Sequence, residues 1–372
     1  MDKPLIPEYG QSTLAEVLPS VACAMGAPGT WTNQLGLPEA SRYVVFLVDG
    51  LGTFQVSKRS DVAPRLANLV SRSRSITSGA PSTTATSISS LGTGLAPGEH
   101  GIAGYAFRNP FDGSFLNALL WADGLSPLDV QPRLTMFERL VAAGVSASIV
   151  VPQRFQGPGL TESALRGAHF LGVPVEEDVE RRIELTVDAS SAHGRSLVYV
   201  YERELDHTGH GLGWQSSEWE EQLSRIEGII WSLREALPDD VRLVVTGDHG
   251  MMDVPDTRRL IIEEEHDLAA ELTLVAGEGR FRQVYTDNPD AVAARWRDRL
   301  GDSAWVRTRT EAIDEGWFGP IGPGMAKRFG DVVAAMRSDM ALMTSTQPRE
   351  FTLVGMHGSL TAEEMTVPLL VL

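Results

Sequence analysis

The chain has 372 residues, of which 42% are hydrophobic and 22% charged, so it can bury a large core and is not globally disordered. Its 32 Lys and Arg residues against 49 Asp and Glu residues give a net charge of −17, which disfavours binding to nucleic-acid polymers and anionic lipid. The single cysteine, Cys23, excludes an intramolecular disulfide. The sequence shows neither a membrane span of about 18 apolar residues nor a signal-peptide pattern, so we expect a cytoplasmic protein.

Apolar, strand-like runs alternate with helix-like segments along most of the chain. The expected strands cover 43–48, 148–152, 196–201, 241–246 and 366–372, and the expected helices cover 61–72, 84–92, 133–143 and 216–236. Fully apolar strands that alternate with helices are typical of a mostly parallel sheet flanked by helices on both faces. We therefore expect an α/β fold, whose ligands bind beyond the carboxyl ends of the strands.

Residues 254–350 break this alternation. Strands are expected near 271–276, 281–285, 304–309 and 331–343, with a helix over 290–300 and a Gly/Pro-rich turn at 318–324. We interpret this segment as a smaller, inserted α+β cap subdomain. Residues 1–253 and 351–372 then form the core that carries the main sheet.

Four glycine-flanked turns carry Asp and His residues after expected strands. In chain order these residues are Asp49, Asp206, His210, Asp248, His249 and His357. A lone Asp after a strand is most often a helix cap, and a lone His is most often structural. Six such residues at one edge of a sheet instead favour a metal site, because Asp and His suit zinc and similar divalent ions. Six ligands are too many for one tetrahedral ion and fit two, which can clamp the attacking and leaving oxygens of a phosphoryl group.

A loop of small residues at 78–83 leads into the expected helix at 84–92, and hydroxyl side chains crowd this junction. The hydroxyls belong to Ser82, Thr83, Thr84, Thr86 and Ser87. Backbone N–H groups at a helix N-terminus attract anions, and a metal-ionised hydroxyl there is a nucleophile for phosphorus. A simple Ser/Thr N-cap is the plain alternative, and both readings are compatible because the cap geometry presents the side chain.

With these motifs in this order, residues 43–372 resemble the alkaline phosphatase superfamily and, within it, the type I phosphodiesterase/nucleotide pyrophosphatase family. The PSTT run at 81–84 matches the family's Pro-Thr-x-Thr turn, and the following TGLAPGEHGI resembles its Thr-Gly-Leu to His-Gly-Ile run. The resemblance implies an alkaline-phosphatase-like core with Thr84 as the nucleophile. It also implies two sets of metal ligands: Asp49, Thr84, Asp248 and His249 for one ion, and Asp206, His210 and His357 for the other. Zinc is the expected metal, with manganese as the alternative.

Substrate recognition is where the sequence departs from the family pattern. Members often have Asn soon after His-Gly-Ile, whereas this chain has Tyr105 there and Asn109 four residues on, so both are candidate substrate contacts. Three other polar residues lie near these motifs in the sequence. We interpret His100 as a structural histidine, and Glu202 and Glu204 as solvent-facing residues.

The resemblance implies a two-metal phosphodiesterase or nucleotide pyrophosphatase that acts through a covalent phosphothreonine on a small phosphoester, with nucleotides as one candidate class. Monoesterases need extra positive charge for the second phosphate charge, and only Arg74 and Arg108 lie near the nucleophile motif, so a diester is favoured. A phosphomonoesterase, a phosphonate hydrolase and a phosphotransferase remain alternatives. A non-catalytic metal-binding protein is the least favoured, since all seven implied ligand positions are filled.

Overall fold

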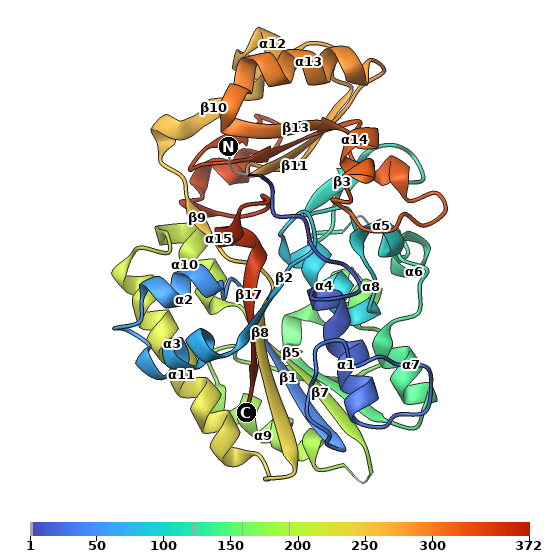
Figure 1. The fold of residues 1–372 in the computed structure, drawn as a ribbon, viewed down its shortest axis with the longest axis vertical. Helices are drawn as coiled ribbons and strands as arrows, with labels where there is room; N and C mark the ends of the chain where they lie inside the picture. Colours follow the sequence, from blue (N-terminus) through green and yellow to red (C-terminus); the bar gives the residue numbers. More distant parts are fainter. Residues whose placement is uncertain (1–2, 122–123, 158, 193) are drawn as a thin grey trace.

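The computed structural model describes residues 3–121, 124–157, 159–192 and 194–372, and its main element is a seven-stranded sheet. The strand order is β2-β17-β8-β1-β7-β5-β6 (Figure 1). The bounds are β1 Arg42–Val48, β2 Arg74–Thr77, β5 Ser146–Pro152, β6 His169–Val173, β7 Ser196–Glu202, β8 Val241–Gly247 and β17 Thr366–Val371. All neighbours pair in parallel except β17, which is antiparallel to both β8 and β2. The predicted α/β fold with a mostly parallel sheet is confirmed.

Both faces of this sheet are covered by helices, which explains why its strands are apolar throughout. On β1, the side chains of Tyr43, Val45 and Leu47 enter one core, and those of Val44, Phe46 and Val48 enter the other. The first core receives α1 Val17–Ala24, α4 Thr84–Thr93, α7 Met136–Ala142 and α8 Leu160–Leu165. The second receives α2 Thr53–Lys58, α3 Pro64–Arg72, α9 Val179–Ser190, α10 Glu204–Leu212 and α11 Ser217–Ala236 (Figure 1).

A second, four-stranded antiparallel sheet lies within the stretch predicted as an insertion. Its order is β11 Leu274–Glu278, β12 Phe281–Tyr285, β14 Val332–Met336 and β13 Ala304–Thr308. The single strand expected over 331–343 is in fact two, since β15 Ala341–Met343 leaves this sheet and pairs with β10 Arg259–Ile261. Helices α12 His266–Ala269 and α13 Pro289–Leu300 cover one face of the second sheet. The limits of the cap subdomain at 254 and 350 stay a prediction.

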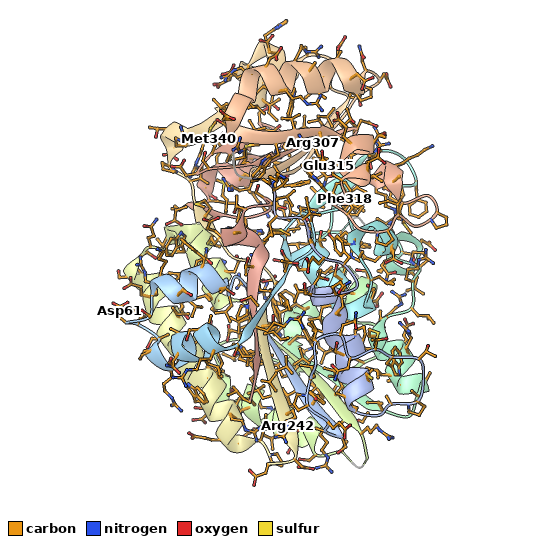
Figure 2. The ribbon with its side chains drawn as sticks, viewed as in Figure 1. Asp61, Arg242, Arg307, Glu315, Phe318 and Met340 are labelled. Atoms are coloured by element: carbon orange, nitrogen blue, oxygen red, sulfur yellow. The ribbon has the colours of Figure 1, made fainter. Side chains whose placement is uncertain are left out.

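The other face of the second sheet packs against the segment that carries α4. Val333 and Ala335 of β14 share a core cluster with Ala80 and Ala85, which flank the turn predicted to carry the nucleophile. Phe318, labelled in Figure 2, belongs to the same cluster. Its ring stacks on Phe329, and its carbonyl accepts a 2.8 Å bond from the Gly98 N–H. One face of the second sheet therefore packs against the residues at the start of α4.

Short elements complete the described structure. They are α5 Pro97–His100, β3 Ala106–Arg108, β4 Phe115–Asn117, α6 Pro127–Val130, β9 Met252–Asp253, α14 Arg309–Asp314, β16 Gly355–Met356 and α15 Ala362–Met365. None of the described helices combines the length and the apolar character that crossing a bilayer requires.

Candidate active site

Three of the four predicted ligand turns meet because β1, β7 and β8 end side by side. In the sheet register, Val48 of β1 pairs with Glu202 of β7 and with Gly247 of β8. Asp49 follows β1 directly, and Asp248 follows β8 directly. Parallel strands present their carboxyl ends at one edge, so these carboxylates converge from neighbouring strands.

Asp206 reaches the same edge from the first turn of α10, after β7. Gly50 permits this approach, because its φ is +75° and a Cβ there would lie only 3.0 Å from the Asp206 Cβ. His210 lies one helical turn after Asp206, and its Nε2 is 3.3 Å from the Asp206 Oδ2. The predicted i, i+4 pair therefore shares one face of a helix.

His357 and Thr84 arrive from outside the parallel strands. Strand β16, which precedes His357, pairs with β9, which follows His249. Thr84 begins α4, where it is partly exposed while its neighbours Thr83 and Ala85 are buried. The Ser87 hydroxyl donates to the Asp248 carbonyl at 2.8 Å, which ties α4 to the end of β8. The turn that carries Thr84 is thus anchored against the predicted ligand Asp248.

The three histidines have the same orientation and the same tautomer. Their Nδ1 atoms lie 2.8–3.0 Å from backbone carbonyls: His210 to Gly355, His249 to Gly250 and His357 to Ser82. Because a carbonyl only accepts, each Nδ1 donates to its carbonyl, and in the neutral ring Nε2 then keeps a lone pair. The Nε2 atoms of His210 and His249 lie 3.3 Å and 3.4 Å from carboxylate oxygens, and the Nε2 of His357 lies 3.3 Å from that of His210. Histidines that bind a metal through Nε2 usually donate a hydrogen bond from Nδ1 to a backbone carbonyl, as these three do.

Two clusters of donors could each hold a metal ion. One contains Asp206, His210 and His357, and the other contains Asp49, Asp206 and His249, with ligand atoms within 4.8 Å of one another in each. The Asp206 Oδ1 and the Asp248 Oδ2 are buried without a hydrogen-bond partner in the described structure. An unpartnered buried carboxylate oxygen is costly unless a cation meets it. Donor types, tautomers and orphaned oxygens all fit two divalent ions.

The pKa shifts follow from the same crowding. Burial raises the pKa of Asp49 well above its usual value; Asp248 and Asp206 add to the rise, and the Tyr201 hydroxyl, which bonds the Asp49 Oδ2, opposes it. Burial also raises the pKa of Asp248 and lowers that of His357. Two buried carboxylates with raised pKa values, beside a histidine with a lowered pKa, form the electrostatic pattern of a cation site.

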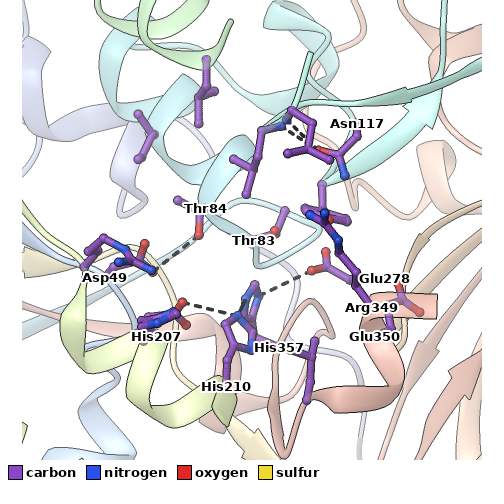
Figure 3. Close-up of a pocket in the computed structure, with 18 of the residues that line it drawn as sticks. Asp49, Thr83, Thr84, Asn117, His207, His210, Glu278, Arg349, Glu350 and His357 are labelled. Atoms are coloured by element: carbon purple, nitrogen blue, oxygen red, sulfur yellow. Dashed lines mark hydrogen bonds and ion pairs between the residues drawn. The ribbon is translucent and has the colours of Figure 1, made fainter. Parts of the chain in front are cut away.

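A cavity of about 840 Å³ opens beside Thr84 and has two kinds of wall. The apolar wall is formed by Ile88, Phe115, Leu119, Leu120, Phe155 and Leu160. The polar end holds Tyr105, Asn117, Glu278 and Arg349. Figure 3 shows Glu278 and Arg349 on the opposite side of the cavity from Asp49. This size and mixture of walls suit a small organic ligand with a few polar groups.

Of the two predicted substrate contacts, Tyr105 lies in the cavity and Asn109 does not line it. Tyr105 lines the cavity, and burial raises the pKa of its hydroxyl. Asn109 is not among the described residues that line the cavity; its Oδ1 accepts a 3.0 Å bond from the Phe111 N–H in the β3–β4 turn. The asparagine of the cavity is Asn117, which the hairpin brings beside Tyr105 by pairing with Ala106.

Several residues at the site were not singled out from the sequence. Among them are Tyr201, which bonds Asp49, and the cavity residues Asn117, Glu278 and Arg349. Tyr201 offered a weak signal, since a hydroxyl stands near the end of an otherwise apolar strand. The other three residues reach the cavity through contacts between segments far apart in the chain, which short sequence motifs cannot indicate.

Fold and site together define an α/β protein of the alkaline phosphatase type, and a family model gives the narrower class. The model described as type I phosphodiesterase/nucleotide pyrophosphatase matches residues 43–360. The chain therefore belongs to this family, as its motif order predicts.

Relatives match over limited stretches of sequence. The chain is 30% identical over 158 residues to ectonucleotide pyrophosphatase/phosphodiesterase family member 7 of Homo sapiens, covering 37% of this chain and 34% of that protein. It is 33% identical over 88 residues to the catalytic subunit of GPI ethanolamine phosphate transferase 3 of Mus musculus, covering 24% and 8%. The match thus spans about a third or less of the length of these relatives.

The fold extends further than the sequence similarity. The structure of murine ectonucleotide pyrophosphatase/phosphodiesterase 5, an inactive threonine-to-alanine variant in complex with AMP, superimposes with a TM-score of 0.69 at 17% identity. The match covers 89% of this chain and 87% of that one. The human counterpart gives a TM-score of 0.68 at 16% identity.

Proposed function

We propose that this protein is a two-metal phosphodiesterase whose nucleophile is Thr84. The observation that carries the proposal is the position of the Thr84 Oγ1, which lies 3.2 Å from the His249 Nε2 and 3.5 Å from the Asp49 Oδ1. The hydroxyl faces the cavity at the first residue of α4, where a nucleophile is presented to a bound ester. Membership of a phosphodiesterase/nucleotide pyrophosphatase family supports the same reaction class.

Two divalent ions are assigned to the donor clusters, zinc first and manganese as the alternative. Asp49, Thr84, Asp248 and His249 hold one, and Asp206, His210 and His357 hold the other. Bound ions of this kind lower the pKa of a hydroxyl or water and stabilise charge on phosphoryl oxygens. Asp206 stands within reach of both clusters, so it links the two sites.

The chain's own groups then perform a double displacement. The Thr84 Oγ forms a bond to phosphorus while the bond from phosphorus to the ester oxygen breaks, and the alcohol leaves. Water then attacks phosphorus, breaks the bond to Thr84 and restores the hydroxyl. The first amides of α4 have no helical acceptor, so they are available to the oxygens of a phosphoryl group bound at Thr84. The apolar wall shelters the organic group of the ester.

A diester is favoured over a monoester because the two arginines near the nucleophile motif in the sequence are engaged elsewhere. Arg108 lies over the Tyr285 ring and 3.9 Å from Asp331, and Arg74 donates to the Gln34 carbonyl. Neither is among the described residues that line the cavity. Of the arginines that do line the cavity, Arg154 and Arg203 are ion-paired, and Arg349 lies across the cavity from Asp49 (Figure 3). AMP is bound by the murine relative, and we propose nucleotides as one substrate class here. The cytoplasmic location stays a prediction.

The decisive experiment compares turnover of bis-p-nitrophenyl phosphate and p-nitrophenyl phosphate by zinc- or manganese-loaded protein. We expect faster cleavage of the diester and a loss of about 10³-fold or more in Thr84→Ala. Thr84→Ser, which keeps a hydroxyl, should retain part of the activity. Undiminished activity in Thr84→Ala would refute the nucleophile, and monoester preference would refute the substrate class. Inactivity of the metal-loaded wild type would favour the phosphonate, phosphotransferase or non-catalytic alternatives.

A further inference from the structure

Glu202 is the last residue of β7, and it bonds to the two segments that carry Asp49 and Asp206. Its carbonyl accepts a 2.8 Å bond from the Asp49 N–H, and Val48, which precedes Asp49, is its partner in the sheet register. Its Oε1 accepts a 3.1 Å bond from the N–H of Glu204, the first residue of α10. One residue therefore contacts the segments that supply the carboxylates of both donor clusters.

The Glu202 carboxylate is itself held in a fixed place. Its residue is 1% exposed, and its Oε2 is bonded by Arg182 of α9, which is 3% exposed. Arg225 of α11 lies 3.5 Å from the same oxygen. Because both arginines meet Oε2, the other oxygen is left for the Glu204 N–H, and charge-assisted bonds of this kind fix the direction of the carboxylate.

Helix α10 receives its first bond from Glu202 and not from its own N-cap residue. In the described structure, the N-cap residue Arg203 makes no capping bond with its side chain. A carboxylate at this end satisfies an amide that has no helical acceptor and interacts favourably with the helix dipole. Asp206 is the third residue of α10 and His210 the seventh, so the position of the first residue decides where both predicted ligands lie.

The contact between α10 and the turn after β1 leaves little freedom in this arrangement. A Cβ on Gly50 would lie only 3.0 Å from the Asp206 Cβ, so the helix already packs closely against that turn. Metal–ligand distances tolerate deviations of about 0.2 Å, which is less than the movement of a helix end that frays. A bond that stops fraying at Glu204 is therefore a condition for placing Asp206 relative to Asp49.

We propose that Glu202 is a positioning residue that sets the relative placement of the two metal sites. Its carbonyl acts on the turn of Asp49, and its carboxylate acts on the helix of Asp206. Glu202 is not among the described residues that line the cavity, so it acts through these ligands and not on the ester. The inference rests on the proposed function, since it concerns the metal sites assigned there. Through Arg182 and Arg225, helices α9 and α11 support the same geometry.

Two double variants separate the bond to Glu204 from the buried ion pair. Arg182→Met with Glu202→Gln removes both charges and keeps an oxygen that can accept from the Glu204 N–H. Arg182→Met with Glu202→Met removes the same charges and the oxygen at a similar side-chain length, and apolar residues often replace a buried ion pair without loss of stability. We expect zinc affinity, measured by competition with a chromogenic chelator, to fall less than about 3-fold in the first variant and about 10- to 100-fold in the second.

Ile230→Ala is the control for lost stability alone, because this buried side chain of α11 lies in the apolar core on the same face of the sheet. It should lower the urea midpoint of unfolding and leave the zinc affinity within about 2-fold of the wild type. Equal zinc affinities in the two double variants, or an equal loss in Ile230→Ala, would overturn the inference and leave the two-metal assignment intact. A folded wild type that binds neither zinc nor manganese would overturn both the inference and the proposed function.

Discussion

The Nε2 atoms of His210 and His357 face each other across 3.3 Å, and neither carries a proton to share. Each ring already donates from its Nδ1 to a backbone carbonyl, of Gly355 and Ser82 respectively. Two lone pairs at this separation repel unless a cation lies against them. The backbone bonds thus hold both rings in the orientation that a cation needs. The conformational entropy of orienting these side chains is lost during folding and not on metal binding.

Asp206 is expected to matter more for metal content than any single histidine, because it belongs to both donor clusters. Asp206→Ala should reduce bound metal from two ions to fewer than one, whereas His210→Ala should leave about one, as measured by elemental analysis of dialysed protein. The control is His207→Ala, which removes an exposed imidazole from the same helix. Retention of two ions by Asp206→Ala would contradict the shared-ligand assignment.

Tyr201 should tune metal affinity through Asp49. Its hydroxyl bonds the Asp49 Oδ2, so Tyr201→Phe frees a carboxylate that the site needs fixed. We expect metal affinity to fall by about 10- to 100-fold in a competition with a chromogenic chelator. Tyr199→Phe is a close control, because the buried Tyr199 hydroxyl has no hydrogen-bond partner among the residues that the structure describes. The assignment fails if both variants bind metal alike.

The buried Arg280–Glu364 pair should support both stability and the site. Both side chains are fully buried, and the Glu364 Oε1 also accepts from the Ser359 N–H, two residues after His357. Glu364→Gln leaves the arginine charge uncompensated, which should cost about 3 kcal/mol of unfolding free energy in urea titrations. Asp339→Asn, which breaks the exposed Arg258–Asp339 pair, should cost less than about 1 kcal/mol. Similar costs for the two would argue against the buried pair.

His100 should make the protein acid-sensitive. Burial lowers its pKa from 6.5 to about 3, with the Arg328 charge assisting. Its Nδ1 accepts from the Ile102 N–H at 3.1 Å and its Nε2 lies 3.0 Å from the Ser90 hydroxyl, so the folded protein needs the neutral ring. Above pH 6.5 this contribution is complete. As the pH falls from 6.5 toward 3, the unfolded chain gains a proton that the folded chain does not, and stability is lost.

When the pH is lowered from 8 to 5, we therefore expect the wild type to lose about 2 kcal/mol of unfolding free energy because of His100. His100→Gln, which keeps the ring's bonding capacity in part, should be less stable at pH 8 but should lose about 2 kcal/mol less on acidification. Urea titrations at both pH values measure the difference. A constant difference between the two proteins would show that His100 does not carry the proton linkage.

Most residues that meet in the two donor clusters could be singled out from the sequence, because they lie next to features with their own local signals. Asp49 and Asp248 follow apolar strands directly, and Asp206 and His210 lie one helical turn apart. The helix at Thr84 was predicted because its start combines small and hydroxyl residues. Such signals extend over ten residues or fewer, which is the range that periodicity and capping patterns cover.

Features set by distant partners could not be predicted in this way. Glu202 was expected to face solvent, yet it is 1% exposed and paired with Arg182 of α9, so that prediction is wrong. Nothing near Glu202 in the sequence indicates a cation twenty residues away. Asn117 enters the cavity only because a hairpin places it beside Ala106, and Arg349 only because its segment follows the second sheet.

The position of β17 has a consequence for synthesis. This strand lies between β8 and β2, so the sheet has an interior gap until residues 366–371 leave the ribosome. His357 also follows the second sheet in the chain, so the stretch that holds His357 and β17 completes both the main sheet and the predicted metal site. A chain without β17 exposes an unpaired edge on β8 and is open to aggregation.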